Sequence, residues 1–182
     1  MERLGDGTRG RSADARGVLI GAPAVSDGAG MWRVARDCAE LDLNSSYSYA
    51  LWCRDFADTS AVARMGETVV GFVIGYVRPR AAGTLMIWQI AVDAAHRGLG
   101  VASALLDDVV RRAADAGVTH LETTIAADNQ ASIALFTALA ARRNAAVDRS
   151  PLFRPEHFAD AHDDEDLFRI GPLTPAGAAV PD

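Results

Sequence analysis

The sequence predicts an α/β (α+β) domain built on a mixed central sheet of about six to seven strands flanked by helices. Three observations carry this prediction. An eight-residue apolar run, Leu85–Val92, is interrupted only by Gln89 and is typical of a buried strand. A glycine-containing turn, 96–100, follows it directly. A helix then begins, and its apolar residues fall at helical spacing on one face: Ala102, Leu105, Leu106, Val109, Val110 and Ala113.

The N-terminal part of the chain is expected to hold a leader, one short strand and a helix. Residues 1–15 are polar, charged and rich in glycine, which indicates a disordered leader. Val18–Ile20 predicts a short strand. Ser26 or Asp27 is expected to cap a helix that runs to about Ala39.

A loop, a second short helix and a hairpin come next. Residues 41–49 are dense in polar groups and tyrosines and predict a loop, and a helix is expected from Ala50. Ser60–Arg64 and Thr68–Val77 predict two strands, and the turn residues 65–67 between them indicate a hairpin.

After a loop at 79–83 come the central strand and its helix, and then a second strand and helix. Gly117 is expected to end the first of these helices. Val118–Ala126 predicts a strand, and the connection is long enough for a parallel crossover. Asp128 or Asn129 is expected to start the following helix.

The remainder of the chain predicts one more strand, Leu167–Ile170, after a tail that contains an acidic run at 162–166. Residues 174–182 are expected to be a frayed end. No internal repeat or second domain is evident, so a single domain is predicted over 16–173.

Composition argues against several classes of partner. The net charge of −6 and the absence of a basic run argue against nucleic acid, while a mildly acidic protein can attract a cationic substrate. No 18-residue apolar segment indicates a membrane span. Cys38 and Cys53 have no metal-ligand spacing, so we expect no metal, two core cysteines and a cytoplasmic protein.

The turn after the central strand carries the pattern Arg97-x-x-Gly100-x-Ala102. The first amides of a helix lack intrahelical partners and favour an anion, and glycine lets the backbone approach a phosphate closely. The pattern fits neither the Walker loop nor the dinucleotide fingerprint. It resembles the pyrophosphate-binding motif of the GNAT acyltransferases.

A second pattern, Asn129-x-x-Ser132-x-x-Leu135-Phe136, resembles the second coenzyme motif of the same family. The resemblance implies the GNAT acyl-CoA N-acyltransferase fold, with acetyl-CoA as co-substrate. It implies that the coenzyme is bound by Ile90, Val92, Arg97, Gly98, Leu99, Gly100, Val101, Ala102, Asn129 and Ser132.

Five further blocks are similar, in order, to the diaminobutyrate acetyltransferases of ectoine biosynthesis. They are Leu41–Tyr49, Cys53–Phe56, Trp88–Asp93, Leu121–Thr124 and His162–Pro172. This resemblance implies acetylation of the γ-amine of L-2,4-diaminobutyrate by direct attack on the thioester, in a homodimer. It implies a substrate pocket of Asp42, Tyr47, Trp88, Glu122 and His162.

Strand alternation gives an independent view of two of these positions. Trp88, Ile90 and Val92 are expected to share one face of the central strand. Glu122 lies in the middle of a strand that should be interior, where a carboxylate is uncommon without a partner. Its partner is either the substrate amine, for which Glu122 would be the base, or an arginine; a third reading is a solvated edge.

The general acid stays unassigned. Phe136 occupies the position where many GNAT enzymes have a proton-donating tyrosine, so Tyr47, Tyr49 or a water molecule must do this work, or the thiolate leaves unprotonated. Two alternative functions also stay open. One is acetylation of another small amine, a polyamine or an aminoglycoside, and the other is acyl-CoA binding without catalysis.

Overall fold

In the computed structural model, the described residues, 12–13, 17–38, 41–160 and 162–173, form an eight-stranded mixed sheet with four α-helices. The strand order is β1-β2-β3-β4-β5-β6-β8-β7. The strands are β1 (Ser12–Ala13), β2 (Val18–Gly21), β3 (Ala61–Met65), β4 (Thr68–Arg78), β5 (Ala81–Val92), β6 (His120–Ala126), β7 (Ala146–Phe153) and β8 (Glu165–Gly171). The α-helices are α1 (Gly28–Arg36), α2 (Ser46–Asp55), α3 (Val101–Asp115) and α4 (Gln130–Arg142).

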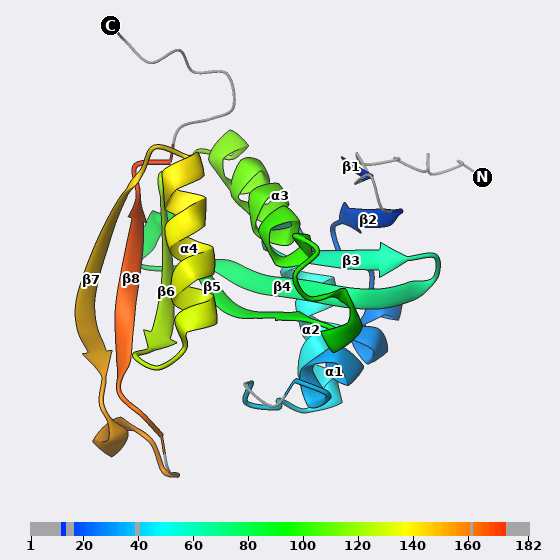
Figure 1. Ribbon diagram of the computed structural model, residues 1–182, viewed down its shortest axis with the longest axis horizontal. Helices are drawn as coiled ribbons and strands as arrows, with labels where there is room; N and C mark the ends of the chain where they lie inside the picture. The colour runs from blue at the N-terminus through cyan, green and yellow to red at the C-terminus, as the bar shows by residue number, and fades with distance from the viewer. Residues whose placement is uncertain (1–11, 14–16, 39–40, 161, 174–182) are drawn as a thin grey trace, which may run out of the picture.

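The sheet divides into two halves that diverge. β5 and β6 are parallel, as the crossover predicted, but they pair only over Thr84–Met86 and His120–Glu122. In Figure 1, β3, β4 and β5 run horizontally while β6, β8 and β7 run vertically. Beyond Met86 and Glu122 the two strands are no longer paired.

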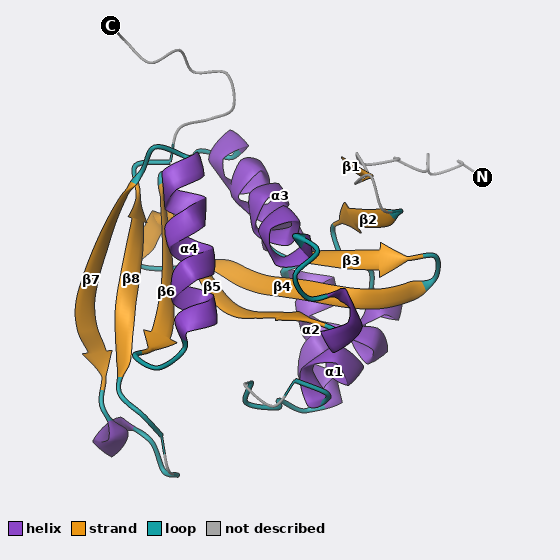
Figure 2. Cartoon of the chain, in the orientation of Figure 1, coloured by secondary structure: helices purple, strands orange, loops and turns teal. Residues whose placement is uncertain are grey.

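Helices cover the two halves differently. Figure 2 shows α4 against one side of β6 and β8, with α1 and α2 grouped at the other half of the sheet. Buried apolar residues of α3 and α4 form one core with the sheet, and buried residues of α1 and α2 form a second core on its opposite face. Two apolar layers therefore fix the sheet from both sides.

The central strand is irregular where the two halves separate. Ile74 of β4 lies opposite Gln89 and Gly75 lies opposite Ile87, so Trp88 is an extra residue in a β-bulge. A bulge reverses the alternation of side chains beyond it. The prediction that Trp88 shares a face with Ile90 and Val92 is therefore wrong. Trp88 packs on Trp52 of the α2 core, whereas the other two join the α3 core.

Three sequence-based predictions of local structure need correction. α2 begins at Ser46, four residues earlier than expected, and α1 ends at Arg36. Asp27 occupies the N-cap position of α1 as expected, but its side chain makes no capping hydrogen bond, because the carboxylate pairs with Arg64 and accepts from the Ala24 amide. The capping positions of Gly117, with φ of 89°, and Asn129 are confirmed.

The longest element that was not predicted from the sequence is the eight-residue strand β7, which was assigned to a tail. Its side chains are almost all exposed, so it shows no hydrophobic period. Within the predicted leader, Ser12–Ala13 pair with β2. The rest of that leader and residues 174–182 lie outside the described residues.

Candidate active site

The loop between β5 and α3 forms a cradle with open space above it. Gly98 and Gly100 have φ angles of 72° and 81°, and a Cβ added at either would meet nothing within 4 Å. Gly100 is the N-cap of the fifteen-residue helix α3, so the free amides of the first turn face this space. A left-handed backbone beside a helix N-terminus is suited to hold a phosphate anion.

A cavity of about 390 Å³ adjoins this loop. It contains nine of the ten residues predicted to bind coenzyme, the exception being Leu99. The nine are Ile90, Val92, Arg97, Gly98, Gly100, Val101, Ala102, Asn129 and Ser132. Loop and strand residues that the two motifs identified separately therefore line one space, which we call the coenzyme cavity.

Side chains in the coenzyme cavity have more specific roles than the motifs predicted. The Arg97 guanidinium donates to the Val92 carbonyl at 3.2 Å and contacts the Cys38 sulfur at 3.4 Å, which ties the loop to the end of β5. Asn129 Oδ1 accepts from the Ser132 amide at 3.0 Å as the α4 cap. Because both side chains already have protein partners, the backbone amides of the loop are the groups best suited to bind an anion.

One polar atom in the coenzyme cavity is buried without a protein partner. His96 Nδ1 has no hydrogen-bond partner among the described residues, and His96 lines the cavity. A buried polar atom normally has a partner. Together with the open glycine loop, this atom fits a polar, phosphate-bearing ligand such as coenzyme A.

A second and larger cavity, of about 680 Å³, opens between the diverging strands β5 and β6. It shares Ile90, Asn129 and Ser132 with the coenzyme cavity, so the two spaces adjoin. Its walls come from β5, β6 and α4, from residues 41–44, and from the segment between β7 and β8. We call it the acceptor cavity.

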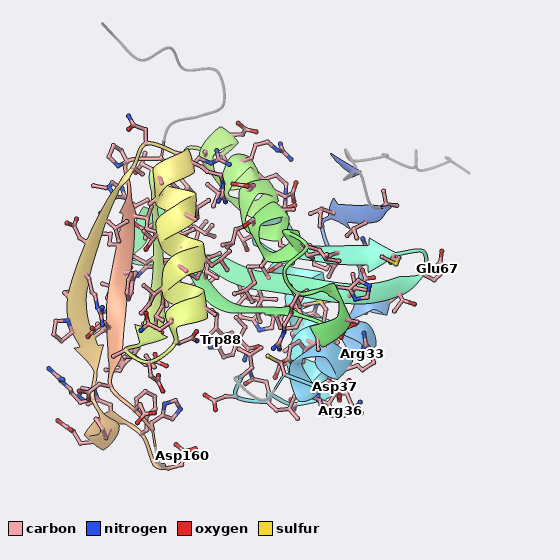
Figure 3. All side chains as sticks on the ribbon, in the orientation of Figure 1. Arg33, Arg36, Asp37, Glu67, Trp88 and Asp160 are labelled. Atoms are coloured by element: carbon pink, nitrogen blue, oxygen red, sulfur yellow. The ribbon has the colours of Figure 1, made fainter. Side chains whose placement is uncertain are left out.

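Three of the five predicted substrate residues meet in the acceptor cavity: Asp42, Trp88 and His162. His162 Nε2 lies 3.2 Å from Asp42 Oδ2, and the imidazole stacks on the Phe158 ring. Trp88, labelled in Figure 3, is 46% exposed and presents an aromatic surface to the space. Residues 42 and 162 lie far apart in sequence, so only the fold brings them together.

Two predicted substrate residues do not line either cavity. Tyr47 is 70% exposed on α2. Glu122 is buried, but its carboxylate accepts from Arg78 Nη1 at 2.5 Å and from Arg169 Nη1 at 3.0 Å. The arginine-paired alternative therefore describes Glu122 here, and a carboxylate held by two guanidiniums is poorly placed to take an amine proton.

Gln89 is a residue whose role the sequence analysis missed. It is buried at the bulge, donates to the Asp42 carbonyl at 2.8 Å, and accepts from the Tyr49 hydroxyl at 3.1 Å. This network holds the loop that carries Asp42. The signal was visible, because Gln89 is the one polar residue in the central apolar run.

Tyr49 is fully buried and lines neither cavity, so its hydroxyl is not positioned to act as the general acid. Burial raises the pKa of its hydroxyl. Phe136 is buried and lines the acceptor cavity, and it offers no proton. Further carboxylates in the acceptor cavity, Asp163 and Glu165, were missed because they belong to an acidic run that is usually solvated.

Neither cysteine has the features of a nucleophile. Burial raises the pKa of the Cys53 thiol to about 11, and its sulfur packs 3.4 Å from the Met31 sulfur. Cys38 is buried, as expected, but also lines the coenzyme cavity. Within the part of the chain that the structure describes, no group of three or more His, Cys, Asp or Glu side chains could hold a metal ion. No described helix is long and apolar enough to cross a membrane.

Comparison with known proteins assigns the family. Residues 29–140 match the acetyltransferase (GNAT) family. The chain belongs to the GNAT acetyltransferases. A curated relative, the L-2,4-diaminobutyric acid acetyltransferase of Streptomyces coelicolor, is 55% identical over 88% of this chain and 96% of its own length. The enzyme of the same name from Halomonas elongata is 42% identical over 88% of this chain and 84% of its own.

Solved structures agree with the GNAT assignment. Diaminobutyrate acetyltransferase EctA from Paenibacillus lautus, solved with its substrate L-2,4-diaminobutyric acid and coenzyme A, superposes with a TM-score of 0.81 and 38% identity. It covers 85% of this chain and 95% of its own. Ard1 from Thermoplasma volcanium, at 18% identity and a TM-score of 0.69, covers 87% of this chain and 98% of its own and shows the shared fold alone. The predicted GNAT fold is confirmed.

Proposed function

We infer that this GNAT enzyme transfers the acetyl group of acetyl-CoA to the γ-amine of L-2,4-diaminobutyrate. The main observation behind this inference is that the coenzyme cavity and the acceptor cavity share three lining residues, Ile90, Asn129 and Ser132. One contains the coenzyme loop, and the other contains acidic and aromatic groups suited to a cationic amine. The names of relatives up to 57% identical give the substrate.

The arrangement supplies two requirements of acetyl transfer. Acetyl-CoA brings an activated thioester, and the adjoining cavities let a bound amine approach it, which replaces a bimolecular encounter. From Ile87 onward, β5 no longer pairs with β6. Backbone groups near Ile90 and Val92 on that edge are therefore available to polarise the thioester carbonyl. No covalent acetyl-enzyme is required.

The amine must lose a proton before it attacks. An alkylamine has a pKa of roughly 10 and is almost fully charged at pH 7. We propose that Asp42 and His162, 3.2 Å apart, receive the ammonium group, with the Trp88 ring as a wall. The earlier catalytic candidates rank below them: Glu122 is occupied by two arginines, and Tyr47 would have to move from an exposed position.

The names of the relatives support a proposal for the biological setting. We propose a role in ectoine formation, as the name EctA implies, in the cytoplasm and as a homodimer. The two free, buried cysteines are compatible with a reducing compartment. Light scattering coupled to size exclusion tests the dimer, and a mass of about one chain would contradict it.

The deciding experiment measures acetyl-CoA-dependent thiol release with 2,4-diaminobutyrate, ornithine, lysine, spermidine and an aminoglycoside, followed by mass spectrometry of the product. We expect a strong preference for diaminobutyrate with the acetyl group on the γ-nitrogen. Turnover of spermidine or the aminoglycoside instead would preserve the coenzyme assignment and overturn the substrate. Coenzyme binding with no turnover of any amine would indicate a non-catalytic module, an alternative that the comparisons do not favour.

A further inference from the structure

Glu122 joins two arginines on the face of the sheet that α4 does not cover. Leu121 and Ile170 belong to the core beneath α4, so their strand neighbours Glu122 and Arg169 point to the opposite face. Arg78 reaches the same carboxylate from β4. The three residues come from β4, β6 and β8, and the fold alone places them side by side.

The three side chains together carry one net positive charge, and the nearby carboxylate of Asp148, opposite Arg169 in the register, forms no ion pair with them among the described residues. Two guanidiniums and one carboxylate sum to +1. The Glu122 side chain is 3% exposed, whereas those of Arg78 and Arg169 are 42% and 43% exposed. Each guanidinium hydrogen-bonds Glu122 through one nitrogen, and no other described residue pairs with either. Their remaining N–H donors are free for a second carboxylate, the ligand that a guanidinium fits best.

The arginine pair lies beside the acceptor cavity. Tyr76, Met86, Glu122 and Arg169 are successive neighbours across the register of four strands. The first two of these line the acceptor cavity. The cavity therefore has one end at Ile90, next to the coenzyme, and another end bordered by the row that holds the arginines.

The charges in the acceptor cavity are otherwise one-sided. Asp42, Asp163 and Glu165 line it, and these carboxylates attract ammonium groups and repel a carboxylate. L-2,4-Diaminobutyrate carries both kinds of group, with its carboxylate at the opposite end from the γ-amine. A substrate oriented with its γ-amine toward the coenzyme needs a positive group at the far end of the cavity.

We propose, resting on the function inferred above, that Arg78 and Arg169 bind the α-carboxylate of the substrate. Glu122 is their positioning residue: it holds both guanidiniums beside the row of Tyr76 and Met86 that lines the cavity, and it leaves one net positive charge for the ligand. The pair then selects amino acids over plain diamines and directs the γ-amine, not the α-amine, to the thioester.

The test compares two acceptors that differ only in the carboxylate, L-2,4-diaminobutyrate and 1,3-diaminopropane. Arg78→Gln and Arg169→Gln are each expected to raise KM for diaminobutyrate about 10- to 100-fold, the scale of a lost charge-assisted hydrogen bond. KM for diaminopropane should change less than about twofold. Arg169→Lys should have a KM between those of wild type and Arg169→Gln, because lysine keeps the positive charge but lacks the planar, bidentate geometry of a guanidinium.

Three further measurements distinguish a lost substrate contact from misfolding of a variant. Arg149→Gln is the matched control, since Arg149 is a half-exposed arginine that pairs with Asp166 on the same sheet, and it should alter neither KM. With wild-type enzyme, the amide of diaminobutyrate should resemble diaminopropane in KM. Glu122→Gln should raise KM for diaminobutyrate more than it lowers kcat.

Several outcomes would overturn the inference. Equal losses with both acceptors in the arginine variants would assign them a structural role, and an unchanged KM for diaminobutyrate would remove them from the site. A wild-type enzyme that treats the amide like the acid would also contradict it. Wild-type enzyme that does not acetylate diaminobutyrate at all would overturn the proposed function first, and the inference with it.

Discussion

Individual residues show how burial and partners change a functional assignment. Asp42 and His162 are separated by more than a hundred positions but meet in one cavity, 3.2 Å apart. For Glu122 a substrate amine, an arginine and a solvated edge were all open, and in the structure its carboxylate meets two arginines. A charged side chain in an interior strand demands a partner, but its chemistry does not say which one.

Asp42→Asn tests the ammonium site. The Asp42 side chain is 84% exposed, so its interaction with a cation is worth about 1 kcal/mol, and KM for diaminobutyrate should rise about fivefold with a smaller change in kcat. Steady-state kinetics measure this. Asp160→Asn, a loop position labelled in Figure 3, serves as the control and should leave KM unchanged. A fall in kcat alone would give Asp42 a different role.

The Cys53 thiol predicts a pH dependence of stability. Its pKa rises from an ordinary value of 9.0 to about 11 on burial, so between these values the folded chain keeps a proton that the unfolded chain loses. The free energy of unfolding should therefore fall as pH rises through this window, by about 2 kcal/mol from this group. Urea titrations of wild type and Cys53→Ala measure the difference, and parallel pH profiles would contradict the prediction.

At the scale of elements, the bulge in β5 determines the site. It sends Trp88 and Gln89 toward the α2 side, where one faces the acceptor cavity and the other supports the Asp42 loop. Bulges recur beside active sites because they re-aim side chains without ending a strand. The β-strand pairing that stops at Met86 then opens the cavity.

Gly75→Ala tests this element. An added Cβ would lie 2.6 Å from the Met86 carbonyl oxygen, on the strand that contains the bulge. Relieving this contact requires a shift of the backbone, which costs more than the rotation of a side chain. We expect a loss of about 1–3 kcal/mol in unfolding free energy, measured by denaturant titration. We also expect a raised KM for the amine. Gly21→Ala is the control, because its Cβ would meet nothing within 4 Å, and equal effects of the two changes would contradict this account.

At the scale of the whole molecule, the diverging sheet halves create two adjoining cavities from one continuous fold. The coenzyme cavity uses β5, α3 and α4, and the acceptor cavity adds residues from β6 and from the segment after β7. Ligand binding should therefore tie both halves together and stabilise the molecule as a unit.

Coenzyme A should raise the melting temperature. At 100 times its Kd, a ligand adds about 2.7 kcal/mol, which corresponds to about 5–10 °C for a chain of this size. Scanning calorimetry measures the shift. At the same concentration, pantetheine, which lacks the pyrophosphate, should give a much smaller shift if the loop at Gly98–Gly100 binds phosphate. Equal shifts would indicate that the glycine loop contributes little.

The sequence alone determined the fold class, the coenzyme loop and part of the acceptor site. These follow from local signals: a hydrophobic period, a glycine turn and a capped helix involve residues close together in the chain. The resemblance to the GNAT motifs named ten coenzyme residues, and nine of them line one cavity. The resemblance also grouped Asp42, Trp88 and His162, and these three residues line the acceptor cavity.

Only the tertiary structure decided the rest. The bulge at Trp88, the exposed strand β7 and the arginine partners of Glu122, which lie 44 and 47 residues away, depend on pairing between distant segments. A shift of one residue in strand register moves every following side chain to the opposite face. Local patterns carry no information about that register, so the face and partner of a strand residue are decided only when the sheet forms.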